Sequence, residues 1–302
     1  MLGVRIKART SKAAAEHPPT GRILDVNGTL VHVHIEGSGP DVILIHGAGG
    51  NWQDFTFSLI PNLKPAFRLI AIDRPGHGHT GRISTRAGDV ESLNEQADLI
   101  HAAAQLVGAK KPLILGQSYG GAVALAYGLR HPTDTAGLVI VSGVSNPWEG
   151  DLDIWYRLTD TWVGRHVLIP VTSAFANDHK ANESLESIFT PDPVPVGYLQ
   201  HMGYGLAIRP SQLKTNAMMV NSLLPQIVEQ SQHYGDLDLP VEIVHGTADT
   251  IVPYYVHAVP LSRQLPNARL TPLEGIGHMP HHADQPSTIA ALRSLAKRAG
   301  LQ

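Results

Sequence analysis

The stretch PLILGQSYGGAVALAY, residues 112–127, decides the fold of this chain. Residues 113–115 are an apolar run of the kind found in central parallel strands, and residues 122–126 favour a helix. Between them Ser118 is flanked by glycines, which let a strand and a helix approach where a Cβ would clash. Such an elbow lifts the serine hydroxyl out of the backbone at the carboxyl edge of a sheet. We therefore predict that Ser118 is a nucleophile; the alternative, a plain glycine-rich connection, would leave it without partners elsewhere in the chain.

The composition is that of an ordinary globular chain. Its 302 residues are 43% hydrophobic and 16% charged, enough for one domain or one domain with an insertion. The net charge of -3 gives no broad basic field, so we expect a small neutral substrate and no nucleic acid partner. The lack of cysteine excludes disulfides, thiolate catalysis and cysteine metal sites. No run approaches the roughly 18 apolar residues of a membrane span, so no integral membrane segment is expected.

The first 21 residues stand apart from the rest of the chain. Arg5, Lys7, Arg9 and Lys12 are followed by no long apolar core, so this segment is not a signal peptide and a cytoplasmic location is expected. We expect an arm that is disordered or docked on the surface, with a membrane-surface or targeting segment as the alternative.

Strand and helix patterns alternate along the remaining sequence. Residues 22–26 and 30–36 flank Asn27-Gly28 as a β-hairpin, and residues 92–95 form a capping box before a helix. Such alternation predicts an α/β fold with a mostly parallel central sheet flanked by helices. The other expected elements are buried strands at 42–45, 67–72, 138–141, 241–244 and 268–273, and a terminal helix at 286–299.

The alternation is interrupted between residues 146 and 237. We expect a mainly helical cap at 146–237, inserted into a core domain of residues 22–145 and 238–302 and preceded by an arm of residues 1–21. The substrate pocket is then expected between the core and this helical lid.

Histidines accompany several of these elements. His32 and His34 alternate with apolar residues in the second strand, and we expect both to face solvent. Their spacing also suits metal ligands, but no third ligand is suggested nearby. His281 and His282 lie at the exit toward the terminal helix, where a metal site is the less favoured alternative. The sequence therefore predicts no metal and no cofactor.

A second glycine-rich loop, HGAGG at residues 46–50, follows the strand at 42–45. Acyl transfer requires two backbone N–H donors for the developing oxyanion, one after the nucleophile and one in a loop after an early strand. These donors would be the N–H groups of Tyr119 and Ala48. The alternative, a phosphate-binding loop, lacks both the G-x-G-x-x-G pattern and a Walker lysine.

Three apolar side chains are the candidate substrate contacts. Trp52 follows the HGAGG loop, Met279 lies in a GIGHMP segment, and Trp155 lies in the insertion. Trp148, Trp155 and Trp162 recur at seven-residue steps, which would place them along one side of a helix. Packing against the core is the favoured role of most of these indoles, and lining a pocket is the alternative.

Four ordered motifs complete the pattern: HGAGG at 46–50, DRPGHG at 73–78, GQSYGG at 116–121, and the pair HGTAD at 245–249 with GIGHMP at 275–280. All of them follow expected strands. In this the chain resembles the capped serine hydrolases of the α/β-hydrolase fold superfamily, from about residue 22 onward. The resemblance implies that the nucleophile, the acid and the histidine are, in chain order, Ser118, Asp249 and His278.

These three residue types suit acyl transfer. A serine hydroxyl is a poor nucleophile near neutral pH, so His278 would take its proton during attack and return it to the leaving group. Asp249 would orient the imidazole and stabilise its charged form; helix capping is the alternative role for this carboxylate. Water activated by the same histidine would then release the acyl group.

The favoured function is hydrolysis of a small or medium, largely apolar carboxylic ester. Serine at the elbow argues against the haloalkane dehalogenases and epoxide hydrolases of the superfamily, which use aspartate. The superfamily's C–C bond hydrolases of diketone-like ring-cleavage products are the alternative, although their elbow more often has Asn and Met where this chain has Gln117 and Tyr119. A low-turnover ligand receptor is a further alternative. The cations that a C–C hydrolase would need for its acidic substrate are Arg157, Arg165 or Arg209.

Overall fold

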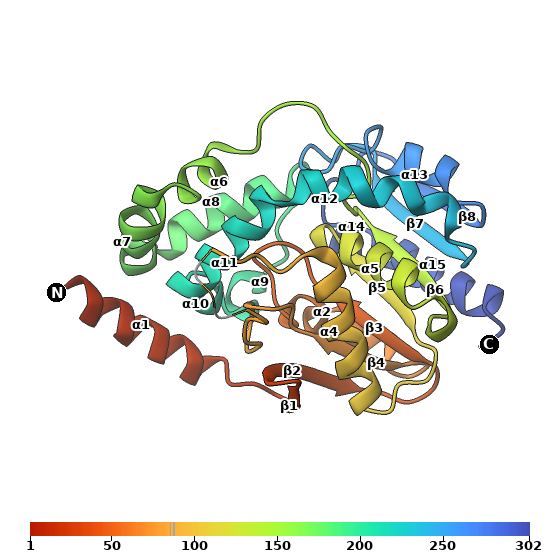
Figure 1. Cartoon of the computed structure of the whole chain (residues 1–302), viewed down its shortest axis with the longest axis horizontal. Helices are drawn as coiled ribbons and strands as arrows, with labels where there is room; N and C mark the ends of the chain where they lie inside the picture. Colours follow the sequence, from red (N-terminus) through yellow and green to blue (C-terminus); the bar gives the residue numbers. More distant parts are fainter. Residues whose placement is uncertain (85, 87) are drawn as a thin grey trace.

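The computed structural model of the protein describes residues 1–84, 86 and 88–302. Its centre is an eight-stranded sheet with the order β1-β2-β4-β3-β5-β6-β7-β8 (Figure 1). The pairs β1–β2 and β2–β4 are antiparallel, and the remaining pairs, from β4 across to β8, are parallel. The predicted mostly parallel α/β fold is therefore confirmed. The strands are β1 (Arg22–Val26), β2 (Thr29–Glu36), β3 (Asp41–Ile45), β4 (Arg68–Ile72), β5 (Leu113–Gln117), β6 (Gly137–Val141), β7 (Val241–Gly246) and β8 (Ala268–Leu273).

Helices cover both faces of the sheet and gather at one end of it (Figure 1). Those along the sheet are α2 (Gln53–Phe57), α3 (Leu59–Leu63), α4 (Leu93–Leu106), α5 (Tyr119–Arg130), η1 (Pro132–Asp134), α13 (Ala258–Gln264), α14 (Pro280–Ala283) and α15 (Gln285–Arg298). Those between β6 and β7 are α6 (Ile154–Thr159), the π-helical turn η2 (Gly164–Leu168), α7 (Ile169–Phe175), α8 (Asp178–Phe189), α9 (Tyr198–His201), α10 (Tyr204–Ala207), α11 (Pro210–Asn221), α12 (Leu223–Gln230) and η3 (Ser231–Asp236). We call residues 146–237 the insertion; the domain boundaries themselves stay a prediction.

Alternate residues of each strand face opposite helical layers, as the pleat requires. In β3, Ile43 and Ile45 pack into a buried cluster with α4 and α5. Val42 and Leu44 pack on the other face, in a cluster that contains residues of α2, α3 and α15. Apolar residues therefore occupy both faces of the central strands, and polar side chains are left to the loops at the strand ends.

Two local predictions are confirmed. Asn27 and Gly28 both adopt positive φ, 52° and 87°, which is the geometry of a two-residue hairpin turn. The capping box also forms, because the Ser92 hydroxyl accepts from the Glu95 N–H while the Glu95 carboxylate accepts from the Ser92 N–H. Short-range side-chain chemistry thus fixed these two boundaries.

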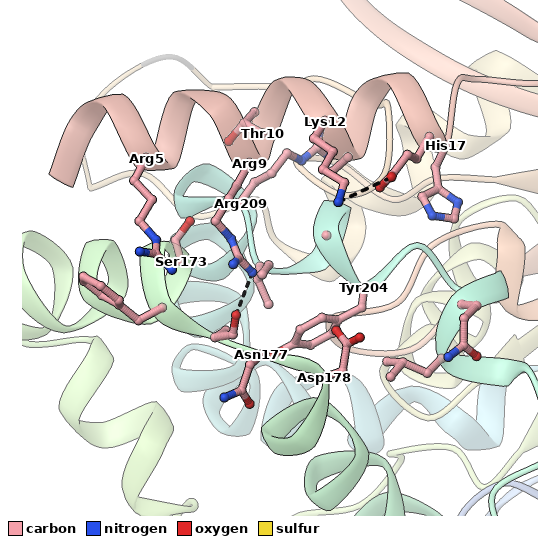
Figure 2. A pocket seen from close by; sticks show the side chains of 18 of the residues that line it. Arg5, Arg9, Thr10, Lys12, His17, Ser173, Asn177, Asp178, Tyr204 and Arg209 are labelled. Carbon is pink, nitrogen blue, oxygen red and sulfur yellow. Dashed lines mark hydrogen bonds and ion pairs between the residues drawn. The ribbon is translucent and has the colours of Figure 1, made fainter. Parts of the chain in front are cut away.

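The N-terminal arm is a helix, α1 (Leu2–Glu16), docked on the insertion. Arg5 Nε donates to the Ala174 carbonyl and Arg9 Nη2 to the Ala176 carbonyl, each over 2.7 Å, at the end of α7. A groove of about 1010 Å³ runs between α1 and helices α7 to α10 (Figure 2). Among the described residues that line it, none is one of the three expected catalytic residues.

The prediction that His32 faces solvent is wrong. His32 is fully buried, and its ring nitrogens lie 2.9 Å from Asp73 Oδ2 and 2.9 Å from the Thr20 carbonyl oxygen. The Trp52 indole covers the same face of β2, with its ring 5.3 Å from that of His32 and 4.6 Å from that of half-buried His34. The alternation in β2 therefore separates two packed faces.

The prediction that three tryptophans share one side of a helix is also wrong. Helix α6 ends at Thr159, and the Thr161 hydroxyl accepts from the Gly164 N–H over 3.0 Å, as a residue that starts a new helix does. Trp148 precedes α6 and packs half-buried against the core. Trp162 follows the break and is exposed. A seven-residue repeat has no common face once the helix is interrupted.

Replacing Gly120 by alanine is expected to destabilise the fold by about 2–3 kcal/mol, the scale of core overpacking. A Cβ there would fall on the carbonyl oxygens of Ile45 and His46, which are backbone atoms that cannot move aside cheaply. Urea unfolding would measure the loss. Gly235→Ala is the matched control, since nothing lies within 4 Å of its Cβ position. A Gly120→Ala protein as stable as the control would contradict this account of the elbow.

Candidate active site

Ser118 stands on a strained turn between β5 and α5. Its φ is 52°, one of few positive values at a non-glycine residue among those described. The turn is held by the Ser118 N–H, which donates to the Val141 carbonyl over 3.0 Å. A Cβ at Gly116 would meet the Gly120 carbonyl, so both glycines are required for strand and helix to come this close. The predicted elbow is therefore formed as the sequence indicated.

The loops after β7 and β8 bring two partners to this serine. His278 Nε2 lies 3.0 Å from Ser118 Oγ, and His278 Nδ1 lies 2.8 Å from Asp249 Oδ2. The three residues are all buried, with Ser118 8% and His278 4% exposed. A hydroxyl, an imidazole and a carboxylate in series can move a proton from the oxygen to the imidazole and stabilise the resulting charge.

Asp249 is held in one orientation by its own loop. Its Oδ1 accepts from the backbone N–H groups of Ile251 and Val252, over 2.9 and 2.8 Å, which leaves Oδ2 for His278. Burial would raise the pKa of Asp249, but contacts with His245 and His278 outweigh it and hold the pKa below its ordinary value. His245 Nε2 has one proton and directs it to the Val252 carbonyl, 2.7 Å away. His278 is therefore the stronger hydrogen-bond partner of the Asp249 carboxylate. Asp249 is therefore ionised near neutral pH.

The two expected oxyanion donors border Ser118. Among the described residues, neither the Ala48 N–H nor the Tyr119 N–H has a hydrogen-bond acceptor, whereas the neighbouring Gly49 and Gly50 N–H groups are both paired. A Cβ at Gly47 would lie 3.2 Å from the Ser118 Cβ, so this loop runs directly against the nucleophile. Two free donors beside a nucleophile are what a developing oxyanion needs.

The buried side chain of Arg74 supports the glycine-rich loop at residues 46–50. Arg74 donates to the carbonyl oxygens of His46 and Gly47, over 3.0 and 2.9 Å, and its guanidinium lies 4.3 Å from the Tyr119 ring. Burial lowers the pKa of Arg74 to about 10, so it stays charged, and burial together with Arg74 lowers the pKa of His46 to about 4. The loop thus rests on a fixed cation and a neutral imidazole, which accepts from the Arg74 N–H at Nε2.

Helix α11 of the insertion contacts the same loop through two polar side chains. Asn216 Oδ1 accepts from the Gly49 N–H over 2.7 Å and lies 3.3 Å from His77 Nε2, while Gln212 Nε2 donates to the Gly49 carbonyl over 3.4 Å. The sequence analysis missed both residues. Their four-residue spacing, which places both side chains on one side of a helix, was the available signal. Another missed neighbour is Tyr156 of α6, where burial raises the pKa of the hydroxyl and Asn216 lowers it.

Replacing Asn216 by alanine is expected to lower kcat about 10- to 100-fold, because the loop that carries the Ala48 N–H loses its anchor to α11 and small displacements of catalytic groups are costly. Steady-state kinetics on a soluble ester would measure the change. Asn221→Ala is the control, since the Asn221 amide on the same helix donates to the Tyr156 and Ala217 carbonyls and, among the described residues, to no group of the loop at residues 46–50. Equal losses of kcat in the two variants would show a general effect of the helix.

The three expected substrate contacts differ in position. Met279, which follows His278 in sequence, is buried, and its sulfur lies 3.5 Å from Nε2 of Gln117, the residue before Ser118. The Trp52 indole packs against the rings of His32 and His34 in β2, which favours a structural role for this side chain. Trp155 is half-buried on α6. Only Met279 has a described contact in the loops around Ser118, and all three remain proposals as substrate contacts.

The arginines considered for an acidic substrate are engaged elsewhere. Arg157 pairs with Asp151 over 2.7 Å, and Arg165 pairs with Asp160. Arg209 donates to the Gly78 and Leu206 carbonyls, and burial lowers its pKa. A substrate carboxylate would therefore compete with existing partners at each of these positions.

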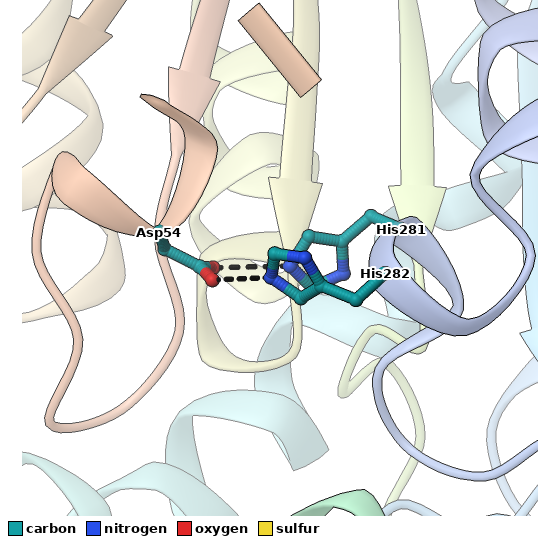
Figure 3. Close-up of side chains that lie close together, drawn as sticks. All are labelled: Asp54, His281 and His282. Atoms are coloured by element: carbon teal, nitrogen blue, oxygen red, sulfur yellow. Dashed lines mark hydrogen bonds and ion pairs between the residues drawn. The ribbon is translucent and has the colours of Figure 1, made fainter. Parts of the chain in front are cut away.

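A second buried cluster joins α2 and α14 (Figure 3). Asp54 Oδ2 lies 3.1 Å from His281 Nε2, and Asp54 Oδ1 lies 2.8 Å from His282 Nε2 and accepts from the Tyr198 hydroxyl over 2.7 Å. Asp54, His281 and His282 are the described residues whose donor atoms are close enough to hold a metal ion. Both carboxylate oxygens already have hydrogen-bond donors, so the Asp54 carboxylate is satisfied without an ion, whereas the buried His281 Nδ1 has no described partner. The expectation of no metal stays a prediction.

Replacing Asp54 by asparagine is expected to cost about 3 kcal/mol at pH 7, because a buried carboxylate that accepts from Tyr198, His281 and His282 is replaced by an amide with a single acceptor oxygen. Burial would raise the pKa of Asp54, but His281 and His282 hold it well below its ordinary value. A lowered pKa in the folded state stabilises the protein above the ordinary pKa of the group, and this contribution is lost on acidification. The difference in the free energy of unfolding between the parent and the Asp54→Asn variant should therefore narrow below about pH 4.

Urea unfolding at pH 7, 5 and 3 would measure this gap. Asp284→Asn is the control, because Asp284 caps α15 through the Ser287 N–H and asparagine caps equally well. A gap that widens as the pH falls would contradict the assigned sign.

Comparison with known proteins adds a family to this geometry. The family model described as the alpha/beta hydrolase family matches residues 42–292. A pimeloyl-acyl-carrier-protein methyl ester esterase of Vibrio campbellii is 25% identical over 280 residues, covering 89% of this chain and 99% of that protein. A 2-hydroxy-6-oxononadienedioate/2-hydroxy-6-oxononatrienedioate hydrolase of Comamonas testosteroni is 25% identical over 272 residues, covering 84% of this chain and 87% of that protein.

Solved structures agree with the sequence matches on the fold. The crystal structure of an esterase from a Rhodococcus species superposes with a TM-score of 0.71 at 22% identity, covering 92% of this chain and 98% of that one. At this identity the likeness concerns the fold alone. Within the part of the chain that the structure describes, no helix is both long and apolar enough to cross a bilayer.

Proposed function

The chain belongs to the alpha/beta hydrolase family, and we propose that it is a serine hydrolase that cleaves a small or medium, largely apolar carboxylic ester through an acyl-enzyme intermediate. The observation that carries the proposal is the unbroken series from Ser118 Oγ through His278 to Asp249, with contacts of 3.0 and 2.8 Å. The N–H groups of Ala48 and Tyr119 beside it, which have no acceptor in the part of the chain that the structure describes, support acyl transfer specifically.

The reaction has two halves. In the first, His278 Nε2 takes the Ser118 proton as the oxygen attacks the ester carbonyl, the oxyanion is bound by the two N–H groups, and the imidazolium then protonates the departing alcohol. In the second, a water molecule gives a proton to His278 and attacks the acyl-enzyme, and the imidazolium returns this proton to Ser118 Oγ as the bond to the acyl group breaks and the acid is released. Ionised Asp249 stabilises the imidazolium in both halves.

Ester cleavage is favoured over C–C cleavage by the arginines. Arg157, Arg165 and Arg209 already have partners, so no prepared site for an acidic substrate is evident among the three. The relative from Vibrio campbellii is an ester hydrolase. Hydrolysis of a C–C bond is the second candidate. The equally similar relative from Comamonas testosteroni is named as a hydrolase of 2-hydroxy-6-oxononadienedioate and 2-hydroxy-6-oxononatrienedioate.

The test compares kcat/KM for p-nitrophenyl butyrate with kcat/KM for a 2-hydroxy-6-oxodienoate ring-cleavage product. A higher value for the ester supports the proposal, and a large preference for the dienoate would replace it with C–C cleavage. A fluorophosphonate probe addresses the receptor alternative. Folded protein that is not labelled at Ser118 and turns over neither substrate would establish a binding role instead.

A further inference from the structure

An apolar ridge lies exposed on the insertion. It consists of Trp162, which is 71% exposed, and of Val163, Val167, Val171 and Phe175, which are 41–59% exposed. The last four residues recur at four-residue steps along η2 and α7, so they share one side of this helical segment. Neighbouring α6 adds exposed Ile154 and Leu158. Apolar side chains clustered in this way on a surface usually mark a contact site.

Helix α1 lies beside this ridge. The Arg5 guanidinium is 4.6 Å from the centre of the Phe175 ring, and its Nε donates to the Ala174 carbonyl. Figure 1 shows α1 and α7 at the same end of the molecule, away from the sheet. The exposed Leu2 and Val4 of α1 extend the apolar surface toward the N-terminus.

The positive charge at this end lies on helix α1. Helix α1 carries four cations, Arg5, Lys7, Arg9 and Lys12, against one carboxylate, Glu16, in a chain whose net charge is -3. The cations of the insertion contribute less, because Arg157 and Arg165 are paired with aspartates. Lys7 is exposed, and Lys12 makes only a 3.6 Å contact with Glu16 on the surface. Positive charge is therefore concentrated on α1, next to the ridge, whereas the insertion carries more carboxylates than cations.

We propose that the ridge and α1 together dock the protein on the surface of a membrane that contains anionic lipids. An aliphatic face with a tryptophan is suited to the boundary between headgroups and acyl chains, and flanking lysines are attracted to anionic headgroups. A second copy of the chain is a less suitable occupant, because it would bring two positively charged α1 helices to one interface. The docking concerns residues remote from Ser118 and does not depend on the proposed hydrolase activity.

The experiment is co-sedimentation of the full chain with sucrose-loaded vesicles of phosphatidylcholine, with and without 30 mole per cent phosphatidylglycerol. We expect binding to the anionic vesicles that weakens in 0.5 M NaCl. The double change Trp162→Ser and Val167→Ser should lower partitioning at least about tenfold, since each side chain gains apolar burial in the bilayer. Lys7→Gln and Lys12→Gln should each lower it about fivefold at low salt. Leu106→Ser is the control, because Leu106 is equally exposed, at 55%, but lies on α4.

Three results would overturn the proposal. One is the absence of binding to anionic vesicles, and another is equal binding by the ridge variant and the Leu106→Ser control. The third is a concentration-dependent dimer, seen by analytical ultracentrifugation, that the ridge variant abolishes, because the occupant would then be a second copy. Circular dichroism and turnover of p-nitrophenyl butyrate in solution should be unchanged in the ridge variant, which separates loss of docking from loss of fold.

Discussion

Replacing Ser118 by alanine is expected to lower kcat for ester hydrolysis by about 10⁶-fold, the scale found when the nucleophile of a serine triad is removed. The variant keeps the free N–H groups of Ala48 and Tyr119, so a small residual rate above that of water should remain. Labelling by a fluorophosphonate probe should disappear completely, since the hydroxyl that donates to His278 Nε2 and attacks the probe is removed. Stopped assays with p-nitrophenyl butyrate and mass spectrometry of the labelled protein would measure both effects.

Ser142 provides a matched control for this variant. It follows β6, the neighbour of β5, is buried, and has a positive φ of 42°, so Ser142→Ala carries the same backbone demands as Ser118→Ala. Its hydroxyl has no described hydrogen-bond partner, and it is not bonded to His278. We expect normal labelling and activity in Ser142→Ala. Comparable losses in both proteins would assign the effect to the backbone and not to the nucleophile.

Replacing Asp249 by asparagine is expected to lower kcat about 10⁴-fold, as when the acid of a serine–histidine–aspartate triad becomes an amide. The Ile251 and Val252 N–H groups will select the amide oxygen at the Oδ1 position, which turns the NH₂ group toward His278 Nδ1. His278 must then accept at Nδ1 and carry its proton on Nε2. An imidazole with a proton at Nε2 cannot take the proton of Ser118, so the nucleophile is no longer activated.

The readout that separates this explanation from simple damage is labelling by the fluorophosphonate probe. Asp249→Asn should be labelled slowly but completely, because the serine oxygen is still present, and its crystal structure should superpose on that of the parent. Asp192→Asn is the control, since Asp192 accepts from the Gly277 N–H beside His278 but does not contact the imidazole. We expect less than a tenfold change for the control. A small effect of Asp249→Asn would refute the assigned orientation of the triad.

The sequence predicted the triad because each of its members sits in a recognisable local pattern. The glycines around Ser118 specify the elbow, and the loops with Asp249 and His278 each follow an apolar run that became a strand. Parallel strands end at one edge of a sheet, so residues that follow them in sequence meet in space. The sequence indicated that these three side chains approach one another. The distances between them depend on how the loops pack, and only the structure gives those distances.

Other residues could not be predicted in this way. His32 looks like a surface residue in an alternating strand, and only the segment before β1 and the Trp52 indole decide that it is buried. The partner of His281 and His282 is Asp54, more than 220 residues away along the chain. No local pattern marks such a pair, because the contact depends on how α2 and α14 pack.

By itself the sequence determined the α/β fold, since local propensity, apolar periodicity and glycine placement act over a few residues. The order Ser118, Asp249 and His278 followed from the resemblance of its motifs to a known family, and the roles of these residues are proposals. Only the tertiary structure decided that Asn216 of the insertion anchors the loop beside Ser118, that α1 is a docked helix, and that the ridge on α7 stays exposed. These features depend on which surfaces of distant segments meet, and that choice is made by packing and burial of the whole chain.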